Sequence, residues 1–269
     1  LYRTVEAVGM DLCPKLGITV PVGKDSMSMR TAWQDQGEDK SVTAPLSLVI
    51  TGFSPVTDVR KTVTPQLQDI ADETQLILID LGAGANRLGG SILAQVYSKM
   101  GSVAPDVDDA DCLKAFFNTI QALLEEDKLL AYHDRSDGGL FTTLAEMAFA
   151  GHTGVSVDIG ALDNDDLAVL FNEELGAVVQ VHSDHAAEVL EQFAQANIQA
   201  YALGTVNKAD SIDISRDGDL LFSKTRADLQ EHWSRTSYQI ASRRDNADCV
   251  KEEFDRIANA DAGLSAKLS

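Results

Sequence analysis

Polar residues that could bind a metal and a phosphate gather in the segment HDRSDGG, residues 133–139, just before a helical pattern. Asp134 offers a hard carboxylate oxygen of the kind that Mg²⁺ prefers, and Ser136 offers a hydroxyl. Gly138 and Gly139 allow backbone N–H groups to approach an anion closely where a helix begins. The corner therefore predicts a Mg²⁺ and phosphate site.

A plain helix cap is the alternative interpretation of this corner. Asp134, Ser136 and Asp137 would lie at the helix N-terminus, where Asp and Ser side chains accept the unpaired N–H bonds. His133 is expected to be structural, because Mg²⁺ prefers oxygen ligands. Arg135 is expected to reach a phosphate or to pair with Asp137. A His-Asp phosphohydrolase is disfavoured, because the remaining histidines show no recognisable ligand spacing; they are His152, His182, His185 and His232.

A second candidate site is the segment GKDS, Gly23 to Ser26, which departs from the P-loop pattern because Asp25 follows Lys24. Lys24 could neutralise phosphate charge as a point cation. The alternative is an exposed turn with a local Lys–Asp pair, which stabilises little.

Two further segments carry weaker signals. The Gly-rich loop GAGANRLGGS, residues 82–91, follows a predicted strand but lacks the dinucleotide fingerprint. Glu173 and Glu174 precede a buried strand; such paired acids are usually solvated, but at a cleft they could bind a metal or an amine.

Hydrophobic periodicity predicts the elements that must position these residues. Strands are expected at 18–23, 45–53, 75–81, 128–134, 154–159, 176–181 and 200–206, with a hairpin at 211–223 turning at Asp217-Gly218. Helices are expected at 1–16, 92–101, 111–126, 140–151, 183–198 and 225–260. The alternation predicts an α/β fold (an α+β sandwich), in which helices pack on a mixed sheet. The polar segment 57–73 is the best candidate for a boundary between subdomains.

Composition excludes several classes of protein. The formal net charge of −20 argues against a nucleic-acid or anionic-membrane surface. The three cysteines contain no CxxC pair, which favours a reducing compartment, and no apolar run is long enough for a membrane span. We therefore expect a cytoplasmic protein. Because Leu1 already lies within a helical pattern, we expect the chain to be a piece of a longer polypeptide.

Four segments together resemble the phosphoribosylformylglycinamidine synthase family of the large, single-chain bacterial type. They are PVGKDSMSM, NRLGGSILAQVY, HDRSDGGLFTTLAEMAFAG and FNEELGAVVQV, in family order along the chain. The resemblance implies an ATP-dependent ligase of purine synthesis. It converts formylglycinamide ribonucleotide, glutamine and ATP to formylglycinamidine ribonucleotide, ADP, phosphate and glutamate.

The resemblance also implies a domain organisation within the aminoimidazole ribonucleotide (AIR) synthetase superfamily. Residues 1–62 would end the N-terminal domain of the second synthetase half, 70–222 would form its C-terminal domain, and 223–269 would be a helical linker toward a glutaminase domain. The partners would be the first synthetase half, the glutaminase domain and the ribonucleotide substrate, without nucleic acid or membrane.

Residue roles are likewise implied by the resemblance. Asp134 matches a Mg²⁺ ligand, and Ser136, with Gly138 and Gly139, matches a site for ATP or ADP. Gly23 would approach ATP, while Lys24, Asp25 and Ser26 would contribute to catalysis in the first half. Smaller family members have a metal-binding Asn where this chain has Lys24. Glu173 and Glu174 depart from a substrate-binding triplet, so no substrate role is expected for them.

Two hypotheses about function follow from the resemblance. This half either contributes to catalysis or is a structural, ADP–Mg²⁺-binding half without a direct catalytic role. In both cases the isolated chain is expected to be inactive.

Overall fold

The computed structural model describes residues 1–24, 29–69 and 73–259. The chain divides into two compact units, Leu1–Val59 and Arg60–Ser269. Within the described ranges, no helix is long and apolar enough to cross a membrane.

The first unit consists of a helical segment and a hairpin. The helical segment runs through α1 (Tyr2–Glu6), a π-helical stretch η1 (Ala7–Leu12) and α2 (Cys13–Leu16), which confirms the helix expected at 1–16. Gly17 ends it with a φ of +75°. Strands β1 (Arg30–Asp35) and β2 (Glu38–Thr43) form an antiparallel pair.

The prediction of strands at 18–23 and 45–53 is wrong. Both segments are mostly exposed coil, and the only sheet in the described part of this unit is the two-stranded β1–β2 pair. A strand persists only where its backbone N–H and C=O groups find partners, and neither segment pairs with the hairpin.

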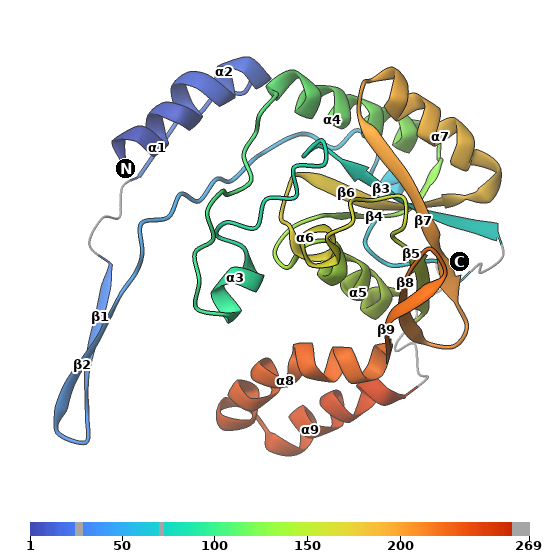
Figure 1. Cartoon of the computed structure of the whole chain (residues 1–269). Helices are drawn as coiled ribbons and strands as arrows, with labels where there is room; N and C mark the ends of the chain where they lie inside the picture. The colour runs from blue at the N-terminus through green and yellow to red at the C-terminus, as the bar shows by residue number, and fades with distance from the viewer. Residues whose placement is uncertain (25–28, 70–72, 260–269) are drawn as a thin grey trace. The chain divides into compact units, whose positions relative to one another are not determined.

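A seven-stranded mixed sheet organises the second unit (Figure 1). Its order is β4-β6-β3-β7-β5-β8-β9, and every neighbouring pair is antiparallel except β5 with β8. The strands are β3 (Thr74–Asp80), β4 (Leu129–Asp134), β5 (Gly154–Asp158), β6 (Gly176–His182), β7 (Gln199–Asn207), β8 (Ser211–Arg216) and β9 (Asp219–Thr225). The β8–β9 hairpin turns at Asp217-Gly218, as predicted, with both residues at positive φ.

Helices cover both faces of this sheet. One face carries α4 (Ala110–Glu125) and α7 (Ser183–Gln195), and the other carries α5 (Gly139–Gly151) and α6 (Asp166–Phe171). The short helix α3 (Ile92–Val96) lies in the connection between β3 and α4 and contributes no residue to either core. Alternate residues of β3 enter different cores: Leu76 and Leu78 pack with α5 and α6, whereas Ile77 and Ile79 pack with α4 and α7. The expected fold class, helices packed on a mixed sheet, is confirmed.

The helix expected at 92–101 is shorter than predicted. α3 ends at Val96, and Ser98 takes a φ of +54°. The carbonyls of Met100 and Val103 accept hydrogen bonds from Gly90 and Gly89. The chain therefore turns back onto the Gly-rich loop instead of continuing the helix.

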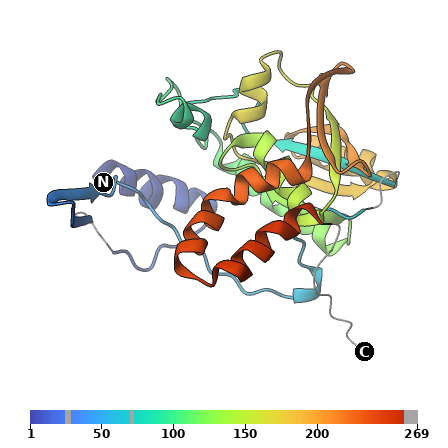
Figure 2. The same ribbon diagram turned by 90° about the horizontal axis from the view of Figure 1, so that it is seen from below.

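The helical region expected at 225–260 is a pair of helices. α8 (Arg226–Arg244) and α9 (Ala247–Asp255) lie side by side (Figure 2), followed by a short 3-10 turn, Arg256–Ala258. Trp233 of α8 packs against Phe149 of α5, which joins the pair to the core. The remaining described element is a 3-10 turn at Val59–Lys61.

Candidate functional site

The corner at residues 133–139 connects β4 to α5. β4 ends at Asp134, and α5 begins at Gly139 after Gly138 as its N-cap residue. Leu140 and Leu144 are fully buried, and they fix the first turns of the helix against the sheet. The predicted strand-to-helix corner is therefore present.

Both glycines of the corner are required by the backbone. Gly138 has a φ of +84° and Gly139 a φ of +69°, a region that side chains with a Cβ rarely adopt. A Cβ on Gly139 would also lie 2.6 Å from the carbonyl oxygen of Asn172. The glycine pair thus allows α5 to start against the end of α6.

Asp134, Ser136 and Asp137 are exposed at this helix end. Their side chains do not cap α5, so the alternative interpretation as a helix cap is wrong. Asp134 Oδ1 instead accepts a hydrogen bond from the Tyr132 hydroxyl at 2.6 Å. Burial, and to a lesser extent the hydrogen bond to Asp134, raises the pKa of Tyr132. The Tyr132 hydroxyl therefore stays protonated and donates this hydrogen bond.

The N–H groups of the glycine pair bind acceptors within the chain. Gly139 N–H donates to the Ser136 carbonyl at 2.9 Å. Gly138 N–H donates to Glu173 Oε1 at 2.8 Å, and the same oxygen accepts the Ile92 N–H at 2.8 Å. Glu173 therefore joins the start of α5 to the start of α3.

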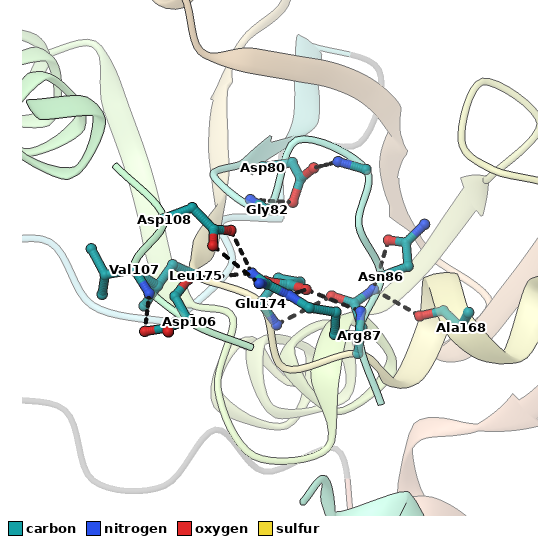
Figure 3. A network of polar contacts seen from close by, with 12 residues as sticks. Asp80, Gly82, Asn86, Arg87, Asp106, Val107, Asp108, Ala168, Glu174 and Leu175 are labelled. Atoms are coloured by element: carbon teal, nitrogen blue, oxygen red, sulfur yellow. Dashed lines mark hydrogen bonds and ion pairs between the residues drawn. The ribbon is translucent and has the colours of Figure 1, made fainter. Parts of the chain in front are cut away.

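Glu174 lies at the centre of a buried ionic network (Figure 3). Its side chain is fully buried, and Arg87 binds both of its oxygens, through Nε at 2.6 Å and Nη2 at 2.8 Å. Arg87 also pairs with Asp108 at 2.8 Å. These contacts raise the pKa of Arg87 above its already high ordinary value. The network fixes the Gly-rich loop 82–91 beside the corner.

Arg135 belongs to the core and not to the exposed corner. It is 5% exposed, pairs with Asp80 and donates to the carbonyls of Glu174 and Leu175. The expectation that it reaches a phosphate or pairs with Asp137 is wrong, because its guanidinium is used inside the fold. The sequence signal for this partner was Asp80, an acid at the end of the strongly apolar strand β3.

Asp80 also organises the Gly-rich loop. Its carboxylate accepts hydrogen bonds from the N–H groups of Gly82 at 3.2 Å and Gly84 at 2.9 Å. In a dinucleotide site such N–H groups would face a phosphate. Here they face the chain's own carboxylate.

His133 has a structural role, as expected. Its Nδ1 contacts the Asp134 carbonyl at 2.8 Å and its Nε2 contacts Glu146 at 2.9 Å. Across residues 1–24, 29–69 and 73–259, no three His, Cys, Asp or Glu side chains are grouped as metal ligands. The exposed Asp134 carboxylate fits a Mg²⁺ ion that takes one protein ligand and completes its shell with phosphate and water oxygens.

The second candidate segment lies in the first unit. Gly23 and Lys24 are exposed and lie in coil. Asp25 and Ser26 lie outside the described residues.

Comparison with protein-family models shows which family the chain belongs to. A model described as "AIR synthase related protein, C-terminal domain" matches residues 75–217, more than half of the chain. The chain belongs to the AIR synthase related family. A second model, "FGAR-AT PurM_N-like domain", matches residues 1–55. Together these matches confirm the resemblance to the phosphoribosylformylglycinamidine synthase family.

Solved structures show the same fold of the AIR synthase related family. PurL of Thermotoga maritima complexed with FGAR superposes with a TM-score of 0.60 at 13% identity, covering 85% of this chain and 37% of that chain. Phosphoribosylformylglycinamidine synthase II of the same organism superposes with a TM-score of 0.58 at 13% identity, covering 84% of this chain and 35% of that chain. PurLQS of T. maritima superposes with a TM-score of 0.53 at 16% identity, covering 63% of this chain and 28% of that chain. The chain thus spans about a third of the length of these proteins.

Proposed function

We propose that this chain is part of an ATP-dependent amidine ligase. The reaction joins an amide nitrogen from glutamine to formylglycinamide ribonucleotide and yields formylglycinamidine ribonucleotide, ADP, phosphate and glutamate. Membership of the AIR synthase related family supports this proposal. So do the PurL structures with related folds, whose descriptions name ATP and FGAR as bound molecules.

Within that ligase, we assign a Mg²⁺–nucleotide site to the corner between β4 and α5. The observation that carries the assignment is the exposure of Asp134 and Ser136 at the N-terminus of a 13-residue helix. The helix dipole and Mg²⁺ would offset phosphate charge on a chain of net charge −20. Asp134 would hold the ion and the Ser136 hydroxyl would donate to a phosphate oxygen.

Nucleotide binding by the chain tests this assignment. We expect Asp134→Asn to weaken binding of ADP with Mg²⁺, measured by titration calorimetry, by at least about tenfold, because a neutral amide is a poor Mg²⁺ ligand. Asp137→Asn is the matched control, since it removes the same charge from the same exposed corner. Equal affinity in wild type and Asp134→Asn would refute the site.

The second candidate function is a structural nucleotide-binding half. The observation in its favour is that Arg135 and the Gly138 and Gly139 N–H groups are bonded within the fold, so that these groups stabilise the corner and take no part in a reaction. Lys24→Met in the full-length synthetase separates the two functions. Lost turnover with retained nucleotide supports a catalytic contribution, whereas unchanged turnover supports the structural one.

A further inference from the structure

Glu173 supplies negative charge at the helix end where the proposed nucleotide would bind. Its Oε1 lies 2.8 Å from the N–H of Gly138, the N-cap residue of α5. A helix N-terminus carries a positive partial charge that favours an anion. In this structure that anion is the carboxylate of Glu173.

The same oxygen also holds a second segment of the chain. It accepts the N–H of Ile92, the first residue of α3, at 2.8 Å. α3 lies in the long connection from β3 to α4, which includes the Gly-rich loop. One carboxylate oxygen therefore links the start of α5 to this connection.

Glu173 is the movable member of the acid pair. The Glu174 side chain is fully buried and bound through both oxygens by Arg87, so its displacement would leave a charge unpaired in the core. Glu173 is only half-buried, and its carboxylate accepts hydrogen bonds from two backbone N–H groups. A competing anion could replace Glu173 without disturbing the ionic network.

We propose that Glu173 is a positioning residue that competes with the nucleotide phosphate for the Gly138 N–H. This inference rests on the proposed nucleotide site. Two anions repel each other at one helix terminus, so phosphate binding displaces Glu173. Displacement also releases the Ile92 N–H. Nucleotide binding then weakens the attachment of α3 to Glu173, and the attachment of α3 weakens nucleotide binding by the same factor.

Glu173→Gln tests the competition in the 269-residue chain. The glutamine amide oxygen can still accept both N–H bonds, but the charge that repels phosphate is gone. We expect ADP with Mg²⁺ to bind about tenfold more tightly than to wild type, measured by calorimetry. Glu191→Gln is the matched control, because its carboxylate contacts Gln195 on the same helix and should leave affinity unchanged.

Amide hydrogen exchange supplies a readout that a purely structural Glu173 would not change. Adding ADP and Mg²⁺ to wild type should accelerate exchange of the Ile92 amide, while the buried β3 amides stay protected. Unchanged affinity in Glu173→Gln together with an unchanged Ile92 amide overturns the inference. If Asp134→Asn still weakens binding in that case, the proposed nucleotide site stands without it.

The remaining outcomes also decide between the two proposals. Binding by Glu173→Gln but not by wild type supports competition in its strongest form. If wild type and Glu173→Gln both fail to bind ADP, the nucleotide site is refuted and the inference falls with it.

Discussion

Buried acids of this protein are each matched to a specific donor, and Glu174 is the clearest case. Its carboxylate is removed from water and depends on Arg87 for both oxygens. Breaking such a pair on one side is strongly destabilising, because the remaining charge has neither water nor a partner. The pair therefore fixes the Gly-rich loop rather than reacting with a ligand.

Arg87→Met should lower the free energy of unfolding by about 3–5 kcal/mol, because it strands the Glu174 carboxylate in the core. Urea unfolding followed by circular dichroism measures the loss. Arg244→Met is the control, because the pair of Arg244 with Asp245 is largely exposed and its removal should leave the urea midpoint nearly unchanged. The double variant Arg87→Met/Glu174→Gln should recover part of the loss. Equal effects of the two arginine variants would contradict this account.

Asp158 predicts a dependence of stability on pH. Hydrogen bonds from the N–H groups of Gly160, Gly218 and Asp217 and from the Ser215 hydroxyl lower its pKa to about 2. A lowered pKa in the folded state means that the carboxylate stabilises the fold above its unfolded pKa of about 3.9. That contribution is lost as the pH falls from about 4 toward 2.

The test compares wild type with Asp158→Asn by urea unfolding at pH 6, 4 and 3. The wild type should be more stable at pH 6, and the difference should shrink as the pH falls, because the variant has no carboxylate to protonate there. A difference between the two proteins that is constant with pH would show that Asp158 acts only through packing.

At the scale of elements, the start of α5 depends on the contact between Gly139 and the end of α6. Gly139→Ala combines a φ of +69° with a Cβ only 2.6 Å from the Asn172 carbonyl oxygen, and should destabilise the protein by at least about 2 kcal/mol. Gly218→Ala is the matched control, because its φ is +87° but no atom lies within 4 Å of the new Cβ. It should cost about 1 kcal/mol. Thermal unfolding distinguishes them, and equal shifts would contradict the steric argument.

Sequence periodicity was sufficient for the elements that bury an apolar face. The β3 strand and the α4, α5 and α7 helices lie within a few residues of their predicted ranges. It failed for segments 18–23 and 45–53, because an apolar run does not reveal whether a neighbouring strand will pair with it. The α6 helix was also missed, because its six residues are too few for a clear period.

The candidate site was only partly accessible from the sequence. The position of the corner follows from two features of the sequence, the change from a strand pattern to a helical pattern and the Gly-Gly pair between them. The role of Arg135 depends on Asp80, and that of Glu173 depends on Gly138 and Ile92. Contacts between residues so far apart in the chain are set by the sheet order, which periodicity does not contain.

On the scale of the whole second unit, one sheet is shared by two cores. Strands β3, β4 and β6 contribute buried residues to both cores, so the two helical layers should unfold together. Phe193 is fully buried in the core beneath α4 and α7, whereas Trp233 packs on the other side against Phe149. These two residues allow the coupling between the layers to be measured.

Phe193→Ala should destabilise the unit by about 3–5 kcal/mol, because it leaves a cavity in a close-packed core. In a Trp33→Phe background Trp233 is the single tryptophan, so its fluorescence reports the opposite layer. In the Phe193→Ala variant, the urea midpoint measured by Trp233 fluorescence should fall together with the midpoint measured by far-UV circular dichroism. Phe117→Ala, on the exposed side of α4, is the control and should shift neither midpoint appreciably. A fluorescence midpoint that stays in place would show that the layers unfold independently.

The central position of β3 has a consequence for biosynthesis. β3 pairs with β6, where Thr74 faces His182, and with β7, where Ile77 faces Ala202. The ribosome therefore releases the most apolar strand well before either of its neighbours exists. Until translation passes residue 182 both edges of this strand lack their partners, and the edge that pairs with β7 stays open until residue 207, a template for pairing with other chains. Chaperone occupancy on translating ribosomes should consequently rise after β3 emerges and fall only once β7 has followed it.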